Sequence, residues 1–139
     1  MKDISEIRQE INELSKKINA PEEFTPTYET PRGDGHPCIK LDGSAYHLVY
    51  EERRKEFERK TTFSVDDLLY YVFDDVTYLM ASDYELENRD LSEDPRKKMF
   101  GRQIELMRKI SNDYAERLKK RIEGILRVSP YQKPPDFIK

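Results

Sequence analysis

Ser64–Arg89 has the sequence S-V-D-D-L-L-Y-Y-V-F-D-D-V-T-Y-L-M-A-S-D-Y-E-L-E-N-R, the most apolar and most aromatic stretch of a very polar chain. Its apolar side chains recur at steps of three and four, the spacing that places them on one face of a helix. Ser64 suits an N-cap, and Asp66 falls in the first turn, where the helix dipole favours negative charge. The stretch therefore predicts one long central helix. Its apolar face comprises Val65, Leu68, Leu69, Val72, Phe73, Val76, Leu79 and Met80.

The opposite face of this helix combines acidic residues with tyrosines. Tyrosine provides a large contact area at low entropic cost, which suits a binding surface. Acidic neighbours favour a basic partner and a faster encounter. This face is therefore either a partner-binding surface or a set of tyrosines packed under the N-terminal helix or the sheet. We call it the acid–tyrosine stripe; it comprises Asp67, Tyr71, Asp74 and Tyr78, with Asp75 at its margin.

Length and composition set limits on the class of protein. The chain has 139 residues, of which 38% are charged, against roughly 25% in typical globular proteins. We expect a single domain over residues 1–139. Cys38 is the only cysteine, which excludes an internal disulfide and suits a reducing compartment. The first residues lack the apolar core of a signal peptide, and no run of about 18 apolar residues could span a membrane. We therefore expect a cytoplasmic protein that does not contact a membrane.

Charge is distributed unevenly along the chain. Between Ser64 and Asp94, ten acidic residues oppose one arginine, whereas between Pro95 and Arg127 eleven basic residues oppose four acidic ones. Two neighbouring helices of opposite charge would attract each other within the fold. Alternatively, the acidic segment forms a surface that meets a basic partner. Both interpretations remain open at this point.

The N-terminal half predicts a helix, a loop and a small sheet. Asp3–Asn19 places isoleucine and leucine at helical spacing. Ala20–Gly35 is rich in proline and glycine and has no helical or strand period, which indicates a loop or an extended strap. His36–Leu41 and Ala45–Arg53 flank Asp42-Gly43, a strong signal for a tight turn between antiparallel strands. The alternation that follows, up to Phe63, permits a third strand.

The C-terminal half predicts two further helices. Asp94 followed by proline forms a good N-cap and first-turn pair for a helix that ends near Ile110. Ser111 or Asn112 then caps the next helix, and the proline-containing tail, residues 129–139, should be irregular. The expected fold is α+β and helix-dominated: an N-terminal helix, an antiparallel sheet of two or three strands, then three packed helices.

Few residues suggest catalysis. His36, Cys38 and His47 lie on the expected hairpin, but zinc sites usually show paired C-x-x-C or H-x-x-x-H spacings that are missing here. No glycine-rich loop precedes a helix, and no motif orients Cys38 as a nucleophile. We therefore expect no enzymatic activity, no metal and no cofactor. Two weaker alternatives remain: a small enzyme built around this hairpin, and a nucleic-acid-associated regulator that uses the basic helices of residues 95–127.

Three blocks of the sequence are distinctive: L-L-Y-x-V-F at Leu68–Phe73, T-x-x-M-A-S-x-Y-E at Thr77–Glu85 followed by Arg89, and F-x-x-Q-I-E-L at Phe100–Leu106. Together they resemble the immunity protein 63 family. Their order and spacing carry the resemblance, which covers about residues 46–131. Such proteins are encoded beside bacterial polymorphic toxins, including those of contact-dependent inhibition systems.

The resemblance implies an immunity protein that binds and neutralises one cognate toxin, through the toxin's C-terminal domain, in the cytoplasm of the producing bacterium. It also implies that Glu85 and Arg89 form an ion pair of the scaffold rather than a partner contact. Nucleic acid is not an expected partner, and the chain should be a monomer or a weak homodimer. If the toxin is a nuclease, the acids Asp67, Asp74 and Asp75 could occupy the place of substrate phosphates.

Overall fold

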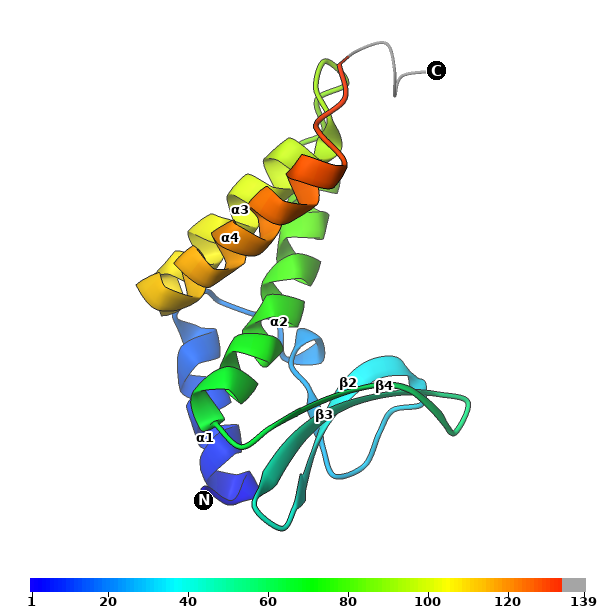
Figure 1. Ribbon diagram of the computed structural model, residues 1–139, viewed down its shortest axis with the longest axis vertical. Coiled ribbons are helices and arrows are strands. Elements are labelled where there is room, and N and C mark those ends of the chain that lie inside the picture. Colours follow the sequence, from blue (N-terminus) through cyan, green and yellow to red (C-terminus); the bar gives the residue numbers. More distant parts are fainter. Residues whose placement is uncertain (134–139) are drawn as a thin grey trace. The chain divides into compact units, whose positions relative to one another are not determined.

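The structure, a computed structural model shown in Figure 1, describes residues 1–133. The chain forms two compact units, residues 1–76 and the part that begins at Thr77. The boundary falls inside helix α2 (Val65–Glu87), so each unit includes several turns of this helix. The single domain expected over residues 1–139 stays a prediction. The expected irregular tail, residues 129–139, lies partly outside the described residues, and residues 129–133 form neither helix nor strand.

Helix α1 (Ile4–Lys16) begins the first unit and confirms the expected N-terminal helix. Asp3 caps it: the Glu6 backbone N–H donates to Asp3 Oδ1 at 2.9 Å, and the Asp3 backbone N–H donates to Glu6 Oε1 at 3.3 Å. Ile7 and Ile11 are fully buried, as their spacing predicts. A short 3₁₀ helix, η1 (Glu22–Phe24), follows within the strap that leads to the sheet.

Among residues 1–133, the sheet has four strands in the order β1-β2-β3-β4. Figure 1 labels three of them, β2, β3 and β4. The strand β1 is parallel to β2, whereas the other two pairs are antiparallel. The α+β class and the antiparallel strands are confirmed, but the expected two or three strands were too few, because the parallel strand β1 makes the sheet mixed. The strands are β1 (Thr27–Tyr28), β2 (Asp34–Asp42), β3 (Ala45–Glu52) and β4 (Lys55–Thr62).

Two tight turns join the antiparallel strands. Gly43, with φ of 58°, forms the expected turn between β2 and β3, where Asp42 pairs with Ala45. The turn between β3 and β4 uses Arg53 and Arg54, with φ of 51° and 68°. Residues with a Cβ atom rarely adopt this left-handed conformation, so the two arginines give no sequence signal for a turn.

Helix α2 begins after Ser64, whose Oγ accepts a hydrogen bond from the Asp67 backbone N–H at 3.2 Å. This contact confirms Ser64 as the residue that caps the helix. Within the first unit, most of the expected apolar face of α2 is buried, and Val65 at its start is partly exposed. Its members Leu68, Phe73 and Val76 have exposed fractions of 0%. These side chains share the core of the unit with Ile39 and Leu48 of the sheet, which are equally buried.

The second unit contains helices α3 (Pro95–Ile110) and α4 (Asn112–Val128), in addition to the last turns of α2. Asp94 and Ser111 cap α3 and α4, as the sequence predicts. Met107 and Leu118 are fully buried in this unit. A buried hydrogen bond joins Gln103 Nε2 to Thr77 Oγ1 at 3.3 Å. The pair of Glu85 and Arg89 forms at 2.7 Å, which agrees with a role of these residues in the scaffold.

Candidate protein-binding site

The residues of the acid–tyrosine stripe fall into both units. Asp67, Tyr71, Asp74 and Asp75 belong to the first unit, where all four are partly exposed. Tyr78 belongs to the second unit and is 49% exposed. The stripe residues are thus accessible rather than fully buried beneath neighbouring elements. Whether they contact a partner stays a prediction.

Asp75 is held by the sheet. The Tyr50 hydroxyl of β3 donates a hydrogen bond to Asp75 Oδ2 at 2.5 Å. Burial is the largest of the influences that raise the pKa of Asp75 from 3.8 to about 6. The hydrogen bond from Tyr50 and the charge of Lys60 act in the opposite direction, whereas the charges of Asp74 and Glu58 raise the pKa further. Burial and the Asp75 charge also raise the pKa of Tyr50, which therefore stays protonated and donates.

Lys60 of β4 lies near the rings of both Tyr50 and Tyr71. Its Nζ lies 5.4 Å from the centroid of the Tyr50 ring and 5.7 Å from that of the Tyr71 ring. A cation over an aromatic ring is attracted by the ring's negative face. Sequence reasoning identified Tyr71 and Asp75 but missed Tyr50 and Lys60, because only the packing of the sheet against α2 brings these residues to the helix. We call Tyr50, Lys60, Tyr71 and Asp75 the polar cluster.

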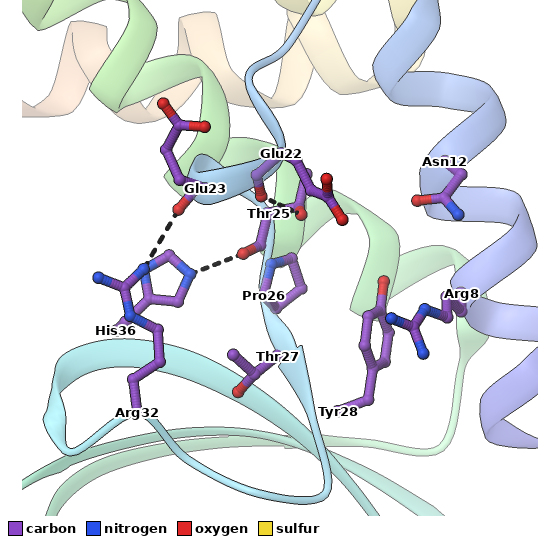
Figure 2. A pocket seen from close by; sticks show the side chains of 10 residues that line it. All are labelled: Arg8, Asn12, Glu22, Glu23, Thr25, Pro26, Thr27, Tyr28, Arg32 and His36. Atoms are coloured by element: carbon purple, nitrogen blue, oxygen red, sulfur yellow. Dashed lines mark hydrogen bonds between the residues drawn. The ribbon is translucent and has the colours of Figure 1, made fainter.

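A separate cavity of about 580 Å³ lies on the β1 side of the sheet, between α1, η1 and the start of β2. Figure 2 shows the side chains that line it. None of these residues was a candidate for partner binding, and His36 was considered only for catalysis. We call it the Arg8 cavity; residues around it include Arg8, Asn12, Glu22, Tyr28, Arg32 and His36.

One wall of the Arg8 cavity is formed by an arginine stacked on a tyrosine. The Arg8 guanidinium carbon lies 4.9 Å from the centroid of the Tyr28 ring. The Tyr28 hydroxyl oxygen is buried and has no hydrogen-bond partner among residues 1–133. Burial raises the pKa of Tyr28 to about 12, against a smaller, opposite influence of the Arg8 charge. A buried donor without a partner carries a desolvation cost of about 1–3 kcal/mol.

The other side of the Arg8 cavity is formed by residues that already have partners. The His36 Nε2 lies 2.6 Å from the Thr25 carbonyl oxygen, to which it donates, as Figure 2 shows. Arg32 Nη2 lies 2.7 Å from Asp34 Oδ2, and its Nη1 donates to the Glu23 carbonyl oxygen at 3.4 Å. These contacts attach the strap to the start of β2 and fix the shape of the cavity.

The hairpin does not assemble the three residues considered for catalysis. Its register pairs Cys38 with Val49 and His47 with Lys40, so the two side chains are not opposite each other. Burial raises the pKa of the Cys38 thiol, which makes it a poor nucleophile. His47 Nδ1 instead lies 2.8 Å from Thr61 Oγ1. Within residues 1–133, no three His, Cys, Asp or Glu side chains are placed to hold a metal ion.

The basic segment of α3 and α4 contains several ion pairs. Arg102 lies 3.2 Å from Glu105, and Arg108 lies 3.6 Å from Glu116. Arg96 pairs with the N-cap Asp94 at 3.0 Å. Part of the positive charge of this segment is therefore compensated within the unit. Among the described helices, none combines the length and the apolar character that crossing a membrane requires.

Comparison with known protein families places this chain in the class of immunity proteins. The family model described as immunity protein 63 matches residues 42–124, more than half of the chain. The chain belongs to the immunity protein 63 family. Membership implies a protein that binds a cognate toxin protein, and it suggests a role without catalysis. Neither the curated proteins nor the solved structures yield a match to the chain.

Proposed function

We propose that this chain neutralises its cognate toxin by stoichiometric binding, and that Asp67, Tyr71 and Asp74 on α2 form the contact. Membership of the family supports a toxin partner. The location rests on one observation: these three side chains are partly exposed on α2, and one of them, Tyr71, belongs to the polar cluster. Asp75 then acts as a positioning residue beneath the contact.

Electrostatics favour a basic partner at this face. The charges of Asp74 and Glu58 raise the pKa of Asp75, whereas the charge of Lys60 lowers it by more than either acid raises it alone. In formal charge, the two carboxylates nevertheless outnumber the one ammonium group. A negative surface of this kind attracts a basic partner over several ångströms and raises the rate of association.

The polar cluster also reduces the entropic cost of binding. Lys60 lies against the Tyr71 ring, so that the side chain is ordered before a partner arrives. Ordering a side chain at an interface costs about 0.5–1.5 kcal/mol, which a preorganised residue avoids. Tyr71 therefore resembles the rigid aromatic anchors around which stable interfaces form.

A nuclease is the toxin class that this surface suits best. Nuclease clefts carry basic residues that bind phosphates, and carboxylates can take the place of those phosphates. Asp67 and Asp74 would then enter the cleft and exclude the nucleic acid. The toxin would be inhibited by occlusion of its active site, without any chemical step performed by this chain.

Neutralising the two acids tests this surface. We expect Asp67→Asn with Asp74→Asn to lower the association rate with the toxin domain encoded beside this gene about tenfold at low salt. The variant should also show a weaker dependence of that rate on salt. Glu13→Gln with Glu123→Gln removes the same charge from exposed positions elsewhere and should leave the rate unchanged. Equal association rates for wild type and the Asp67/Asp74 variant at low salt would reject the proposed contact.

A further inference from the structure

Arg8 is held in place without the use of its hydrogen-bond donors. Its guanidinium stacks on the Tyr28 ring at 4.9 Å, and no hydrogen bond or ion pair joins it to another residue among residues 1–133. In contrast, Arg32 pairs with Asp34 and Arg59 with Glu56, each at 2.7 Å. The attraction between a cation and the face of an aromatic ring favours this position of the guanidinium and leaves its N–H groups available. Arg8 is thus a preoriented cation at the cavity wall.

The cavity beside Arg8 has the size of a binding site. Its volume of about 580 Å³ falls within the roughly 300–1,000 Å³ of pockets that bind ligands. Figure 2 shows Arg8 and Tyr28 on one side of Pro26, with Arg32 and His36 on the other side. Because Arg32 is already paired, Arg8 is the guanidinium of this cavity that remains available for a ligand.

The lining favours a carboxylate over other anions. A guanidinium binds a carboxylate or a phosphate through two parallel hydrogen bonds, so the neighbouring charges decide between these anions. Glu22 and Glu23 also line the cavity, and Glu22 illustrates their effect. Its negative charge repels a phosphate dianion more than it repels a carboxylate, and it can accept an N–H from a peptide. The combination fits an acidic residue presented on a protein chain.

The Arg8 cavity lies outside the part of the chain that the family model describes. Every residue that lines it precedes residue 42, where the match begins. Features of this cavity can therefore differ between members without a change in the matched segment. We propose that Arg8 binds an aspartate or glutamate side chain of the toxin and thereby helps to select it, an inference that rests on the proposed function. With a basic toxin surface at α2 and an acidic one at Arg8, the two contacts fix the orientation of the partner.

The chemistry of the cavity can be tested on the isolated chain. The probe is N-acetyl-aspartate N-methylamide at tens of millimolar, with the asparagine analogue as its neutral match. We expect saturable NMR shifts of the Arg8 side-chain N–H with the acid only. The accompanying shifts of Tyr28 and His36 should vanish in Arg8→Gln and persist in Lys17→Gln, which removes a charge from an exposed position of the same segment. Absent shifts, equal shifts in Arg8→Gln, or tighter binding of inorganic phosphate would overturn the assignment.

The role in toxin selection needs the toxin domain itself. Arg8→Gln should weaken its binding about tenfold or more, as expected for an arginine at the centre of an interface, while Lys17→Gln should not. Unchanged toxin affinity in Arg8→Gln would overturn the role in selection and leave the proposed function intact. If the wild-type chain does not bind the toxin domain, the proposed function fails, and the NMR titration still decides the chemistry of the cavity.

Discussion

Two tyrosine hydroxyls at different parts of the sheet differ in whether they have a hydrogen-bond partner. On the β3–β4 side, Tyr50 donates to Asp75 at 2.5 Å, and Lys60 covers its ring. On the β1–β2 side, Arg8 stacks on Tyr28, but the Tyr28 hydroxyl has no partner among residues 1–133. Burial raises the pKa of both tyrosines, so both remain protonated donors.

This difference suggests which of these residues stabilise the fold and which are available to bind a partner. In the polar cluster the buried groups satisfy one another, and removal of one group leaves another buried and unsatisfied. In the Arg8 cavity the donors of Arg8 and Tyr28 have no hydrogen-bond partner among residues 1–133, so their removal should cost little stability. We therefore expect loss of the Tyr50 hydroxyl to destabilise the fold and substitution of Arg8 to weaken binding. Four measurements of unfolding test this contrast.

The largest effect concerns Asp75 and pH. Its pKa is about 6 in the folded chain and near 3.8 when unfolded, so the folded state binds the proton more tightly. The contribution of Asp75 protonation to the free energy of unfolding is complete below about pH 4 and is lost as the pH rises through about 6. We expect the difference in unfolding free energy between wild type and Asp75→Asn to change over this window by up to about 3 kcal/mol, to the disadvantage of wild type. Urea unfolding at several pH values measures it, and a pH-independent difference would contradict the raised pKa.

The second effect is the loss of the Tyr50 hydroxyl. Tyr50→Phe keeps the ring beneath Lys60 and removes the donor to Asp75. A hydrogen bond to a charged group contributes about 1.5–3 kcal/mol, so we expect a loss of about 2 kcal/mol near neutral pH. The urea midpoint should fall without a change in slope. A loss below about 0.5 kcal/mol would mean that the contact does not support the fold.

The same substitution at Tyr28 should act in the opposite direction. Tyr28→Phe keeps the ring under Arg8 and removes a buried hydroxyl that has no partner among residues 1–133. We expect unchanged stability or a gain of up to about 1 kcal/mol, because the desolvation cost disappears. Comparison of the two phenylalanine variants in one thermal or urea series measures the contrast directly. A loss equal to that of Tyr50→Phe would remove the distinction between the two sides.

The smallest effect is expected for Arg8. Glutamine has nearly the helix propensity of arginine, and Arg8 is exposed on α1, so Arg8→Gln should change stability by less than about 0.5 kcal/mol. Parallel measurement of Lys17→Gln provides the baseline for loss of one surface charge. A loss of more than about 1 kcal/mol would assign Arg8 to the support of the fold rather than to binding.

Local signals in the sequence were sufficient for the helices and for one turn. Asp94 and Ser111 identified the starts of α3 and α4, because a capping side chain acts within three residues of itself. Asp42-Gly43 marked the β2–β3 turn by an equally local signal, because glycine readily adopts the positive φ that the turn requires. The strand β1 has two residues, too few for any periodicity, and its parallel pairing with β2 depends on residues about ten positions away.

The sites were less accessible to sequence reasoning than the elements. The helical period placed Tyr71 and Asp75 on α2, but Tyr50 reaches Asp75 only through the packing of β3 against that helix. The Arg8 cavity combines α1, the strap and β2, and no pattern in the sequence signals such a junction. Glu85 and Arg89 show the reverse case, since their ion pair is local to one helix and the sequence predicted it.

Inhibition of the toxin by this chain is the most direct test of the proposed function. Increasing amounts of the chain are added to a fixed amount of the toxin domain encoded beside its gene, and the toxin's activity is measured. The account predicts that activity falls linearly and is abolished near one equivalent of wild-type chain. The Asp67/Asp74 and Arg8 variants should require an excess, and the Lys17 variant should behave as wild type. Full toxin activity in the presence of excess wild-type chain would contradict the account.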